Sequence, residues 1–316
     1  MYLFKKCISA VVTMLLVTIV VFSLFQMIPG DPILSKMGEN RDPALEAALR
    51  SEYGLDKPAP VRYFSWLAGL VRGDLGISIR YTQPVSALIA QRLPVTLWLS
   101  LLAFLLTIAV GIPVGVLAAR GRNKGTGFVF NLIVQLGMAV PPFYVAMLLI
   151  LVFCIGLGWL PVVAYVPLSD GFGPFLQGLL LPAVSVSLGA AAVTARYTRG
   201  SFLDQMGGNY VRTAVSNGIP ERRMLYGYVL RNALVPIITI LGLLLVSVLT
   251  GSMVVESVFS IPGLGSLLFD AIKGRDLPLV EGITVYISAV VIFGFLLLDV
   301  LYGIIDPRIR LKGESQ

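Results

Sequence analysis

The 316-residue sequence contains no histidine and only 2 cysteines. The absence of histidine excludes imidazole zinc sites, Ser–His–Asp triads and histidine proton relays. Cys7 and Cys154 lie in or beside apolar runs, where they offer neither a disulfide framework nor a metal-ligand spacing. Phosphate-loop, dinucleotide, H-E-x-x-H and G-x-S-x-G motifs are missing, as are paired carboxylates within one apolar run. The sequence therefore disfavours a membrane-embedded protease or synthase, and a nucleotide that drives this protein must bind another chain.

Charged residues are scarce too, at 13% of the chain against about 25% in soluble domains. Hydrophobic residues make up 57%, and the mean hydropathy is +0.87. This composition predicts a polytopic, all-α integral membrane protein without a sizeable separate soluble domain. The net charge of +7 is interpreted through its position along the membrane segments, and not as a nucleic-acid-binding surface.

Six apolar runs approach or exceed the roughly 20 residues that a helix needs to cross a bilayer. They cover residues 8–28, 95–119, 126–156, 176–197, 233–255 and 283–304. The first run is too long for a signal-peptide core of about 7–15 residues, so we expect an uncleaved span. Gly111 and Gly115 permit close helix packing in the second run, and Pro141-Pro142 predicts a kink in the third.

The segments between these runs differ in character. Residues 29–94 are polar and predict a small external helical cap, with short helices over residues 43–53, 60–72 and 84–92. Residues 264–272 predict a helix too short to span, either re-entrant or interfacial. The expected organisation is a cytoplasmic N-terminus and first span (1–28), the cap (29–94), a five-helix membrane core (95–305) and a cytoplasmic tail (306–316).

Basic residues mark one side of the predicted helices. The short loops on that side carry Lys5 and Lys6, Arg120 to Lys124, Arg196 to Arg231, and Arg308 to Lys312. Short cytoplasmic loops are enriched in Lys and Arg, whereas long translocated segments count for little. Both termini are therefore expected in the cytoplasm and the cap outside.

A polar, basic segment, residues 209–232, separates the fourth and fifth runs. It predicts two short amphipathic helices, with Gly218 ending the first, Pro220 starting the second and Glu221 in the second helix's first turn. One face of the first helix carries the small residues Val211, Ala214, Val215 and Gly218. A lipid-bound helix would favour bulky apolar residues, so the small face favours insertion into a groove of a partner protein.

Short motifs in this segment and along the whole chain occur in a recognisable order. They include Pro29-Gly-Asp-Pro32, Gly73-Asp-Leu-Gly76, Tyr210-Val-Arg-Thr-Ala214, Leu230-Arg-Asn-Ala-Leu-Val-Pro236 and Pro262-Gly-Leu-Gly265. Together they resemble the binding-protein-dependent ABC importer permeases of the dipeptide, oligopeptide and nickel branch, in particular their first (B-type) permease subunit. Residues 209–232 resemble the "EAA" loop of these proteins. The name-giving Glu-Ala-Ala is here Arg212-Thr213-Ala214, so only Ala214 and Gly218 carry over directly.

The resemblance implies the type I ABC importer permease fold and a transport rather than an enzymatic role. The coupling loop, residues 199–232, would seat in a cleft of a cytoplasmic ATPase subunit. Its implied contact residues are Tyr210, Arg212, Ala214, Gly218, Glu221 and Arg222. The implied partners are a homologous second permease, two cytoplasmic ATPase subunits, an external solute-binding protein and membrane lipid, without nucleic acid. ATP and Mg are expected on the ATPase subunits, with no cofactor or metal on this chain.

The implied solute is a di- or oligopeptide, or a relative such as glutathione or a nickel–metallophore chelate, carried across a bacterial inner membrane. A stand-alone secondary transporter is the alternative, and it needs acids near the bilayer midplane and often inverted repeats. An assembly subunit without a transport role is a further alternative. Glu256 is a candidate translocation-pathway residue or an external hydrogen-bonded cap. Asp299, near the cytoplasmic end of the sixth run, is either a functional intramembrane acid or a packing residue paired with a basic residue such as Arg196 or Arg308.

Overall fold

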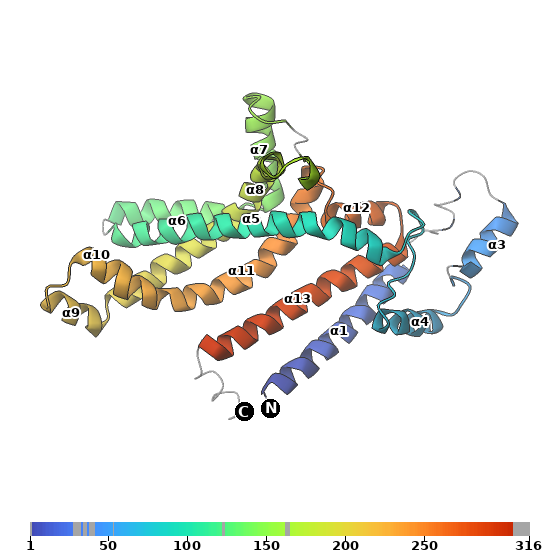
Figure 1. Cartoon of the computed structure of the whole chain (residues 1–316), viewed down its shortest axis with the longest axis horizontal. Helices are drawn as coiled ribbons and strands as arrows, with labels where there is room; N and C mark the ends of the chain where they lie inside the picture. The colour runs from blue at the N-terminus through green and yellow to red at the C-terminus, as the bar shows by residue number, and fades with distance from the viewer. Residues whose placement is uncertain are drawn as a thin grey trace. The chain divides into compact units, whose positions relative to one another are not determined.

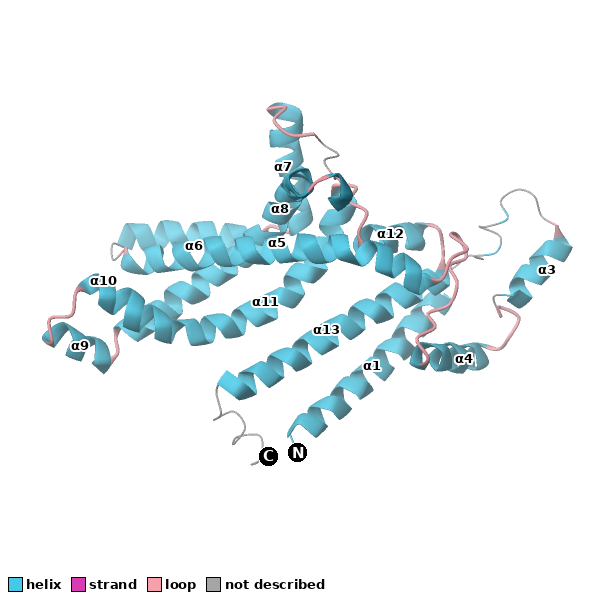
Figure 2. Ribbon diagram, viewed as in Figure 1, coloured by secondary structure: helices cyan, strands magenta, loops and turns pink. Residues whose placement is uncertain are grey.

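The structure is a computed structural model that describes residues 2–27, 33, 37, 42–52, 54–121, 124–161 and 165–305. These residues are helical apart from loops and an isolated antiparallel bridge between Ile77 and Pro84 (Figure 2). Among them, 5 helices are long and apolar enough to cross a membrane, or up to 6 if one bent pair is a single span. The predicted all-α membrane class is confirmed. The chain divides into two compact units, residues 1–94 with 262–316 and residues 95–261.

The first unit contains the N-terminal and C-terminal helices (Figure 1). Its helices are α1 (Tyr2–Met27), α3 (Pro43–Glu52), α4 (Ala59–Val71), α12 (Leu264–Lys273), α13 (Leu277–Ile305) and the first residues of α5 (Val85–Arg120). Helix α13 packs against α1 and α12, and α4 packs against α1. The short helices predicted over residues 43–53, 60–72 and 264–272 correspond to α3, α4 and α12.

Asp276 joins the loop before α5 to the start of α13. Its side chain is buried, and its carboxylate accepts hydrogen bonds from the Ser78 hydroxyl and from the backbone N–H groups of Ile79 (3.1 Å) and Arg80 (3.0 Å). A third backbone donor, the N–H of Leu279 in the first turn of α13, lies 3.3 Å away. The same carboxylate therefore fixes the loop and caps the helix.

The second unit is a helical bundle around α8. Its elements after α5 are α6 (Lys124–Ala139), α7 (Pro142–Leu149), the π-helix η1 (Ile150–Gly156), the 3₁₀-helix η2 (Leu168–Asp170), α8 (Phe172–Met206), α9 (Asn209–Ser216), α10 (Glu221–Arg223), the π-helix η3 (Met224–Val229) and α11 (Leu230–Val258). Helix α8 packs against α6, α7 and α11. Its buried residues contribute to two apolar cores, one containing Phe175 and Leu179 and the other Phe202 with Ile237 of α11.

Two glycines bring α5 close to α8. A Cβ on Gly111 would lie 2.6 Å from the Thr194 Cβ, and one on Gly115 would lie 2.6 Å from the Ala195 carbonyl oxygen and the Thr198 Cβ. Contacts this short leave no room for a side chain. The predicted close packing at Gly111-x-x-x-Gly115 is confirmed, and Thr194 and Thr198 of α8 are the side chains that contact these glycines.

Prolines account for two differences from the expected helices. Residues 84–92 were predicted as a separate helix, but α5 runs from Val85 through Pro94 to Arg120, because a membrane helix tolerates the loss of a single N–H bond. At Pro141-Pro142 the predicted kink is a complete break. Pro141 has an extended backbone (ψ 145°), and residues 127–139 and 142–156 meet at 98°.

The predicted domain boundaries stay predictions. Residues 29–94 do not form a compact unit of their own. They belong to the unit that also contains residues 1–28 and 262–316. The predicted tail, residues 306–316, lies outside the described residues.

Candidate functional site

The coupling loop expected over residues 199–232 overlaps the end of α8. Residues 199–206 of the expected loop are the last turns of α8, which ends at Met206. Within these turns, the Arg199 Nε donates to the Ala118 carbonyl (3.4 Å), and its guanidinium lies 5.4 Å from the centre of the Phe130 ring. Arg199 thus links α8 to α5 and α6, so the segment starts from a helix that is anchored to its neighbours.

Helix α9 follows α8 after a two-glycine turn. Tyr210 is half-buried, and its hydroxyl donates to the Gln205 side-chain oxygen (3.0 Å) near the end of α8. Of the predicted contact residues, Tyr210 therefore already has a partner within the chain. Its placement suits a role in setting the angle between α8 and α9.

The inner face of α9 is part of the core of its own bundle. Val211 and Ala214 are buried, at 7% and 5% exposure, in a cluster that includes Phe202, Leu225 and Val229. The sequence pattern was right that Val211 and Ala214 share a face. Residues of α8 and η3 cover that face, and the role of Ala214 as a contact for an ATPase subunit stays a prediction.

Gly218 ends α9 in a Schellman motif. Its φ is +71°, its N–H donates to the Val215 carbonyl (3.0 Å), and the next N–H, of Ile219, donates to the Ala214 carbonyl (3.1 Å). Ile219 also packs against the core cluster that contains Ala214, the apolar contact that accompanies this motif. A Cβ on Gly218 would meet nothing within 4 Å, so the structure requires glycine here for its backbone conformation rather than for space.

The second predicted helix is continuous with the fifth span. Pro220 precedes α10, and its carbonyl accepts from the Met224 N–H (3.0 Å). The chain then runs through the π-helix η3 into α11, so that residues 221–258 form one apolar helix. A displacement of the Gly218 turn would reach the membrane helix directly, because no loop lies between Glu221 and α11.

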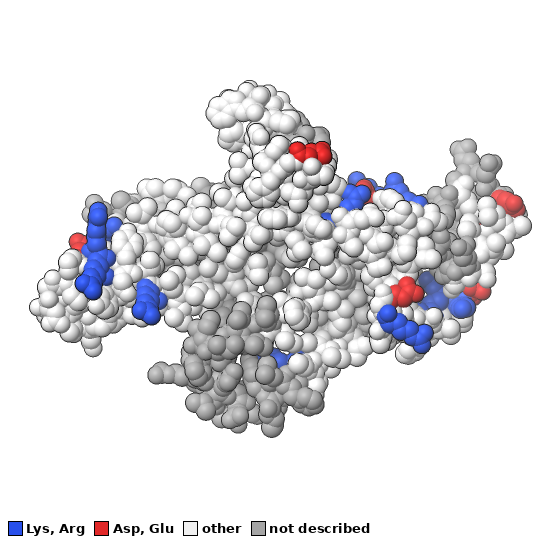
Figure 3. Space-filling view, in the orientation of Figure 1, with Lys and Arg blue, Asp and Glu red and all other residues white. Residues whose placement is uncertain are grey.

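The outer face of the segment is polar and basic. Arg212, Glu221 and Arg222 are exposed, as is Arg223. Figure 3 shows blue side chains gathered over the α9–α10 end of this bundle. Val215 is 60% exposed, so it, rather than Ala214, is the apolar side chain that α9 leaves uncovered within this chain. A helical wheel centred on the buried pair Val211 and Ala214 would have identified it.

The two acids singled out in the spans are placed differently. Glu256 lies in α11 and is fully buried, so it does not line an open passage in this conformation, and its pathway role stays a prediction. Asp299 lies in α13, but its side chain is outside the described residues. Two buried acids next to the sixth span, Asp276 and Glu281, were missed because they precede its apolar run. Within the described residues, no group of three or more His, Cys, Asp and Glu residues could hold a metal ion.

Comparison with known proteins places this arrangement in a family. Residues 111–311 match the model described as "Binding-protein-dependent transport system inner membrane component", and residues 1–100 match the model of the corresponding N-terminal region. The chain belongs to this family. It is therefore an inner-membrane, multi-pass permease subunit of the ABC type, with the type I importer fold, and the family works with ATPase and solute-binding proteins.

Individual relatives align over nearly the whole permease. A Brucella abortus protein described as a peptide transport system permease is 41% identical over 306 residues, covering 97% of this chain and 98% of the relative. The oligopeptide transport system permease protein AppB of Bacillus subtilis is 38% identical over 316 residues, covering 98% and 99%. A probable peptide ABC transporter permease of Sinorhizobium fredii is 38% identical over 312 residues, with the same coverage.

Proposed function

We propose that this permease passes peptides into the cytoplasm after a solute-binding protein delivers them. The observation that carries the peptide assignment is identity of 38–41% along nearly the full chain to relatives named for peptide or oligopeptide transport. The complete transporter would contain a homologous second permease and two ATPase subunits. Both termini would face the cytoplasm. This chain would be the non-enzymatic part, with ATP and Mg held by the ATPase subunits.

The proposed coupling element is the outer face of α9 together with the Gly218 turn. Support comes from how firmly the segment is held: Val211 and Ala214 are buried, and the Gly218 turn closes with two backbone hydrogen bonds. A rigid segment passes on a displacement, whereas a flexible loop would absorb it. Arg212, Glu221 and Arg222 are exposed and would contact the ATPase cleft.

Reconstitution of the complete transporter tests this proposal. Liposomes containing the two permeases and the ATPase subunits would be given binding protein with a dipeptide, an oligopeptide, glutathione or a nickel chelate. We expect peptide-dependent ATP hydrolysis and peptide uptake. Uptake by this chain alone, driven by an ion gradient, would instead support the secondary-transporter alternative. Stimulation by glutathione or the chelate, with no response to peptides, would overturn the peptide assignment.

A further inference from the structure

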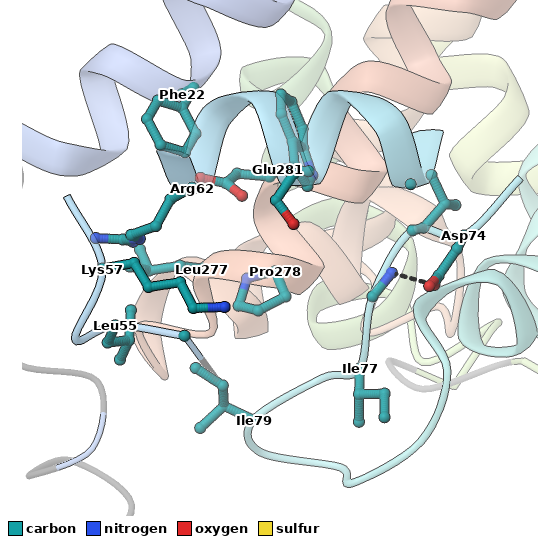
Figure 4. Close-up of a pocket in the computed structure, with 16 residues that line it drawn as sticks. Phe22, Leu55, Lys57, Arg62, Asp74, Ile77, Ile79, Leu277, Pro278 and Glu281 are labelled. Atoms are coloured by element: carbon teal, nitrogen blue, oxygen red, sulfur yellow. Dashed lines mark hydrogen bonds between the residues drawn. The ribbon is translucent and has the colours of Figure 1, made fainter. Parts of the chain in front are cut away.

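The first compact unit contains a cavity of about 380 Å³. Its walls come from α1, the loop before α4, α4 itself, the loop of residues 74–79 and the first turns of α13 (Figure 4). The lining is mainly apolar, from residues such as Phe22 and Pro278, with a few charged side chains among them. A mainly apolar cavity of this size with a few polar groups is typical of a small-molecule site.

Two polar groups in this cavity form no hydrogen bond with the residues that the structure describes. Glu281 is 7% exposed, and its carboxylate forms no hydrogen bond or salt bridge with these residues, although the positive charge of Arg62 acts on it. The Trp66 indole N–H is buried and has no acceptor among the described residues. Buried polar groups in proteins are nearly always satisfied, so a carboxylate and a donor left open in one cavity indicate a ligand.

Two basic side chains line the same cavity, so its charge is mixed. Lys57 and Arg62 lie on the side of the pocket where Glu281 also lies (Figure 4). Arg62 uses Nη1 on the Gln26 side-chain oxygen (3.2 Å), which leaves most of its N–H donors for a ligand. Asp74, the other acid, accepts from the Gly76 N–H (2.9 Å) and is engaged in its own turn. The two basic side chains and the Glu281 carboxylate therefore suit a zwitterion, a ligand that carries both an oxyanion and a cation.

The surroundings of the cavity are those of a membrane surface. Helix α1 is long and apolar enough to cross a membrane over residues 6–24, and only 17% of that stretch is buried, so most of it faces outward. Where α1 meets α4, Phe22, Tyr63 and Trp66 form an aromatic cluster with ring centres 5.3 to 6.2 Å apart, and Phe64 beside them is 66% exposed. Trp and Tyr beside basic residues are enriched where a protein crosses from hydrocarbon to headgroups.

We propose that this cavity binds the headgroup of a phospholipid that carries a phosphate and a primary ammonium, as phosphatidylethanolamine does. Lys57, Arg62 and the Trp66 N–H hold the phosphate, and the Glu281 carboxylate accepts hydrogen bonds from the ammonium. The acyl chains extend along the exposed apolar surface of α1.

This assignment predicts which lipids the site rejects. Phosphatidylcholine has the same phosphate, but its quaternary ammonium has no N–H to donate to Glu281. Phosphatidylglycerol has the phosphate and two hydroxyl donors but no cation, so it brings a net negative charge to Glu281 and no opposite charge to balance it. The site should therefore rank ethanolamine above choline and above glycerol headgroups.

The test is lipid retention by the full chain, purified with its co-expressed partners from membranes containing equal amounts of the three phospholipids. Mass spectrometry of the retained lipid should show phosphatidylethanolamine enriched about tenfold over each of the others, the size expected for one hydrogen-bonded charged group. Equal retention of the three lipids would overturn the proposal, and this arm needs no variant.

Variants then test which side chain binds the ammonium and which binds the phosphate. Glu281→Gln should remove the preference for ethanolamine over choline, whereas Arg62→Gln should lower retention of both. The matched controls are Asp56→Asn and Arg72→Gln, exposed residues of the same unit that do not line the cavity, and both should leave retention unchanged. Unchanged lipid selectivity in Glu281→Gln would overturn the proposal. So would displacement of the bound lipid by a free dipeptide, which would make the cavity a solute site.

Discussion

Gly218 offers a test that separates backbone conformation from the space a side chain needs. Its φ of +71° lies in the left-handed region, and a Cβ added there meets nothing within 4 Å. Alanine has a small side chain but adopts this region reluctantly, at a cost of about 1–2 kcal/mol. Asparagine is larger but tolerates it. If the backbone conformation matters, Gly218→Asn should retain more function than Gly218→Ala. If the space for a side chain matters, the order should be reversed.

The size of the effect follows from the two hydrogen bonds that close the turn. A cost of about 1–2 kcal/mol corresponds to a roughly 5- to 30-fold increase in the fraction of open turn. In Gly218→Ala, the N–H groups of residues 218 and 219, which donate to Val215 and Ala214, should exchange with solvent faster by that factor. Exchange in Gly218→Asn should be closer to wild type.

The functional assay is ATP hydrolysis stimulated by peptide-loaded binding protein. We expect Gly218→Asn to retain more stimulation than Gly218→Ala, and Gly218→Trp, which adds bulk to strain, to insert normally but lose coupling. Gly200→Ala is the control, because Gly200 lies in α8 with open space around it and should tolerate the change. If the Ala variant retains coupling as well as the Asn variant, the left-handed backbone conformation of Gly218 is not what coupling requires.

Further predictions concern packing and buried polar groups. Gly115→Leu should push α5 away from α8 and lower the melting temperature by an amount that corresponds to about 1–3 kcal/mol or more. The control Gly200→Ala should leave the melting temperature unchanged, and equal melting temperatures of the two variants would contradict the close packing. Asp276→Ala leaves buried donors without an acceptor and should cost about 2 kcal/mol or more in thermal unfolding, compared with no measurable change in the exposed control Asp270→Asn. Ala214→Trp should lower thermal stability even without the ATPase subunits, because Ala214 is buried within this chain; unchanged stability would show that the face opens to a partner.

The sequence pattern placed Val211, Ala214 and Val215 on one face, but the structure buries the first two and leaves Val215 60% exposed. Val211, Ala214 and Val215 follow helical spacing, and the helix formed as predicted. The small side chains were interpreted as a face that inserts into a groove of a partner protein, whereas Val211 and Ala214 pack in a core cluster with Phe202 of the preceding helix. That contact depends on how α8 and α9 meet, which the spacing within α9 does not encode.

Proline and the missed acids show a similar limit. The pattern treated Pro94 as a helix boundary and Pro141 as a kink, but α5 continues through the first, and α6 ends before the second. A proline removes one hydrogen bond in every case, and the packing around it decides between continuation and a break. Asp276 and Glu281 were missed for a related reason. Their burial depends on loops about 200 residues away in sequence, which only the folded unit brings to them.

In the proposed transporter, the exposed face of α9 contacts an ATPase subunit. A photo-crosslinking residue in place of Val215, which is 60% exposed, tests it directly in the assembled transporter. Trp159, 69% exposed in the loop after η1 of the same bundle, provides the matched control position. We expect an adduct with the ATPase subunit from position 215 and none from position 159. An assembled, active transporter that gives no adduct from position 215, or equal adducts from both positions, would contradict it.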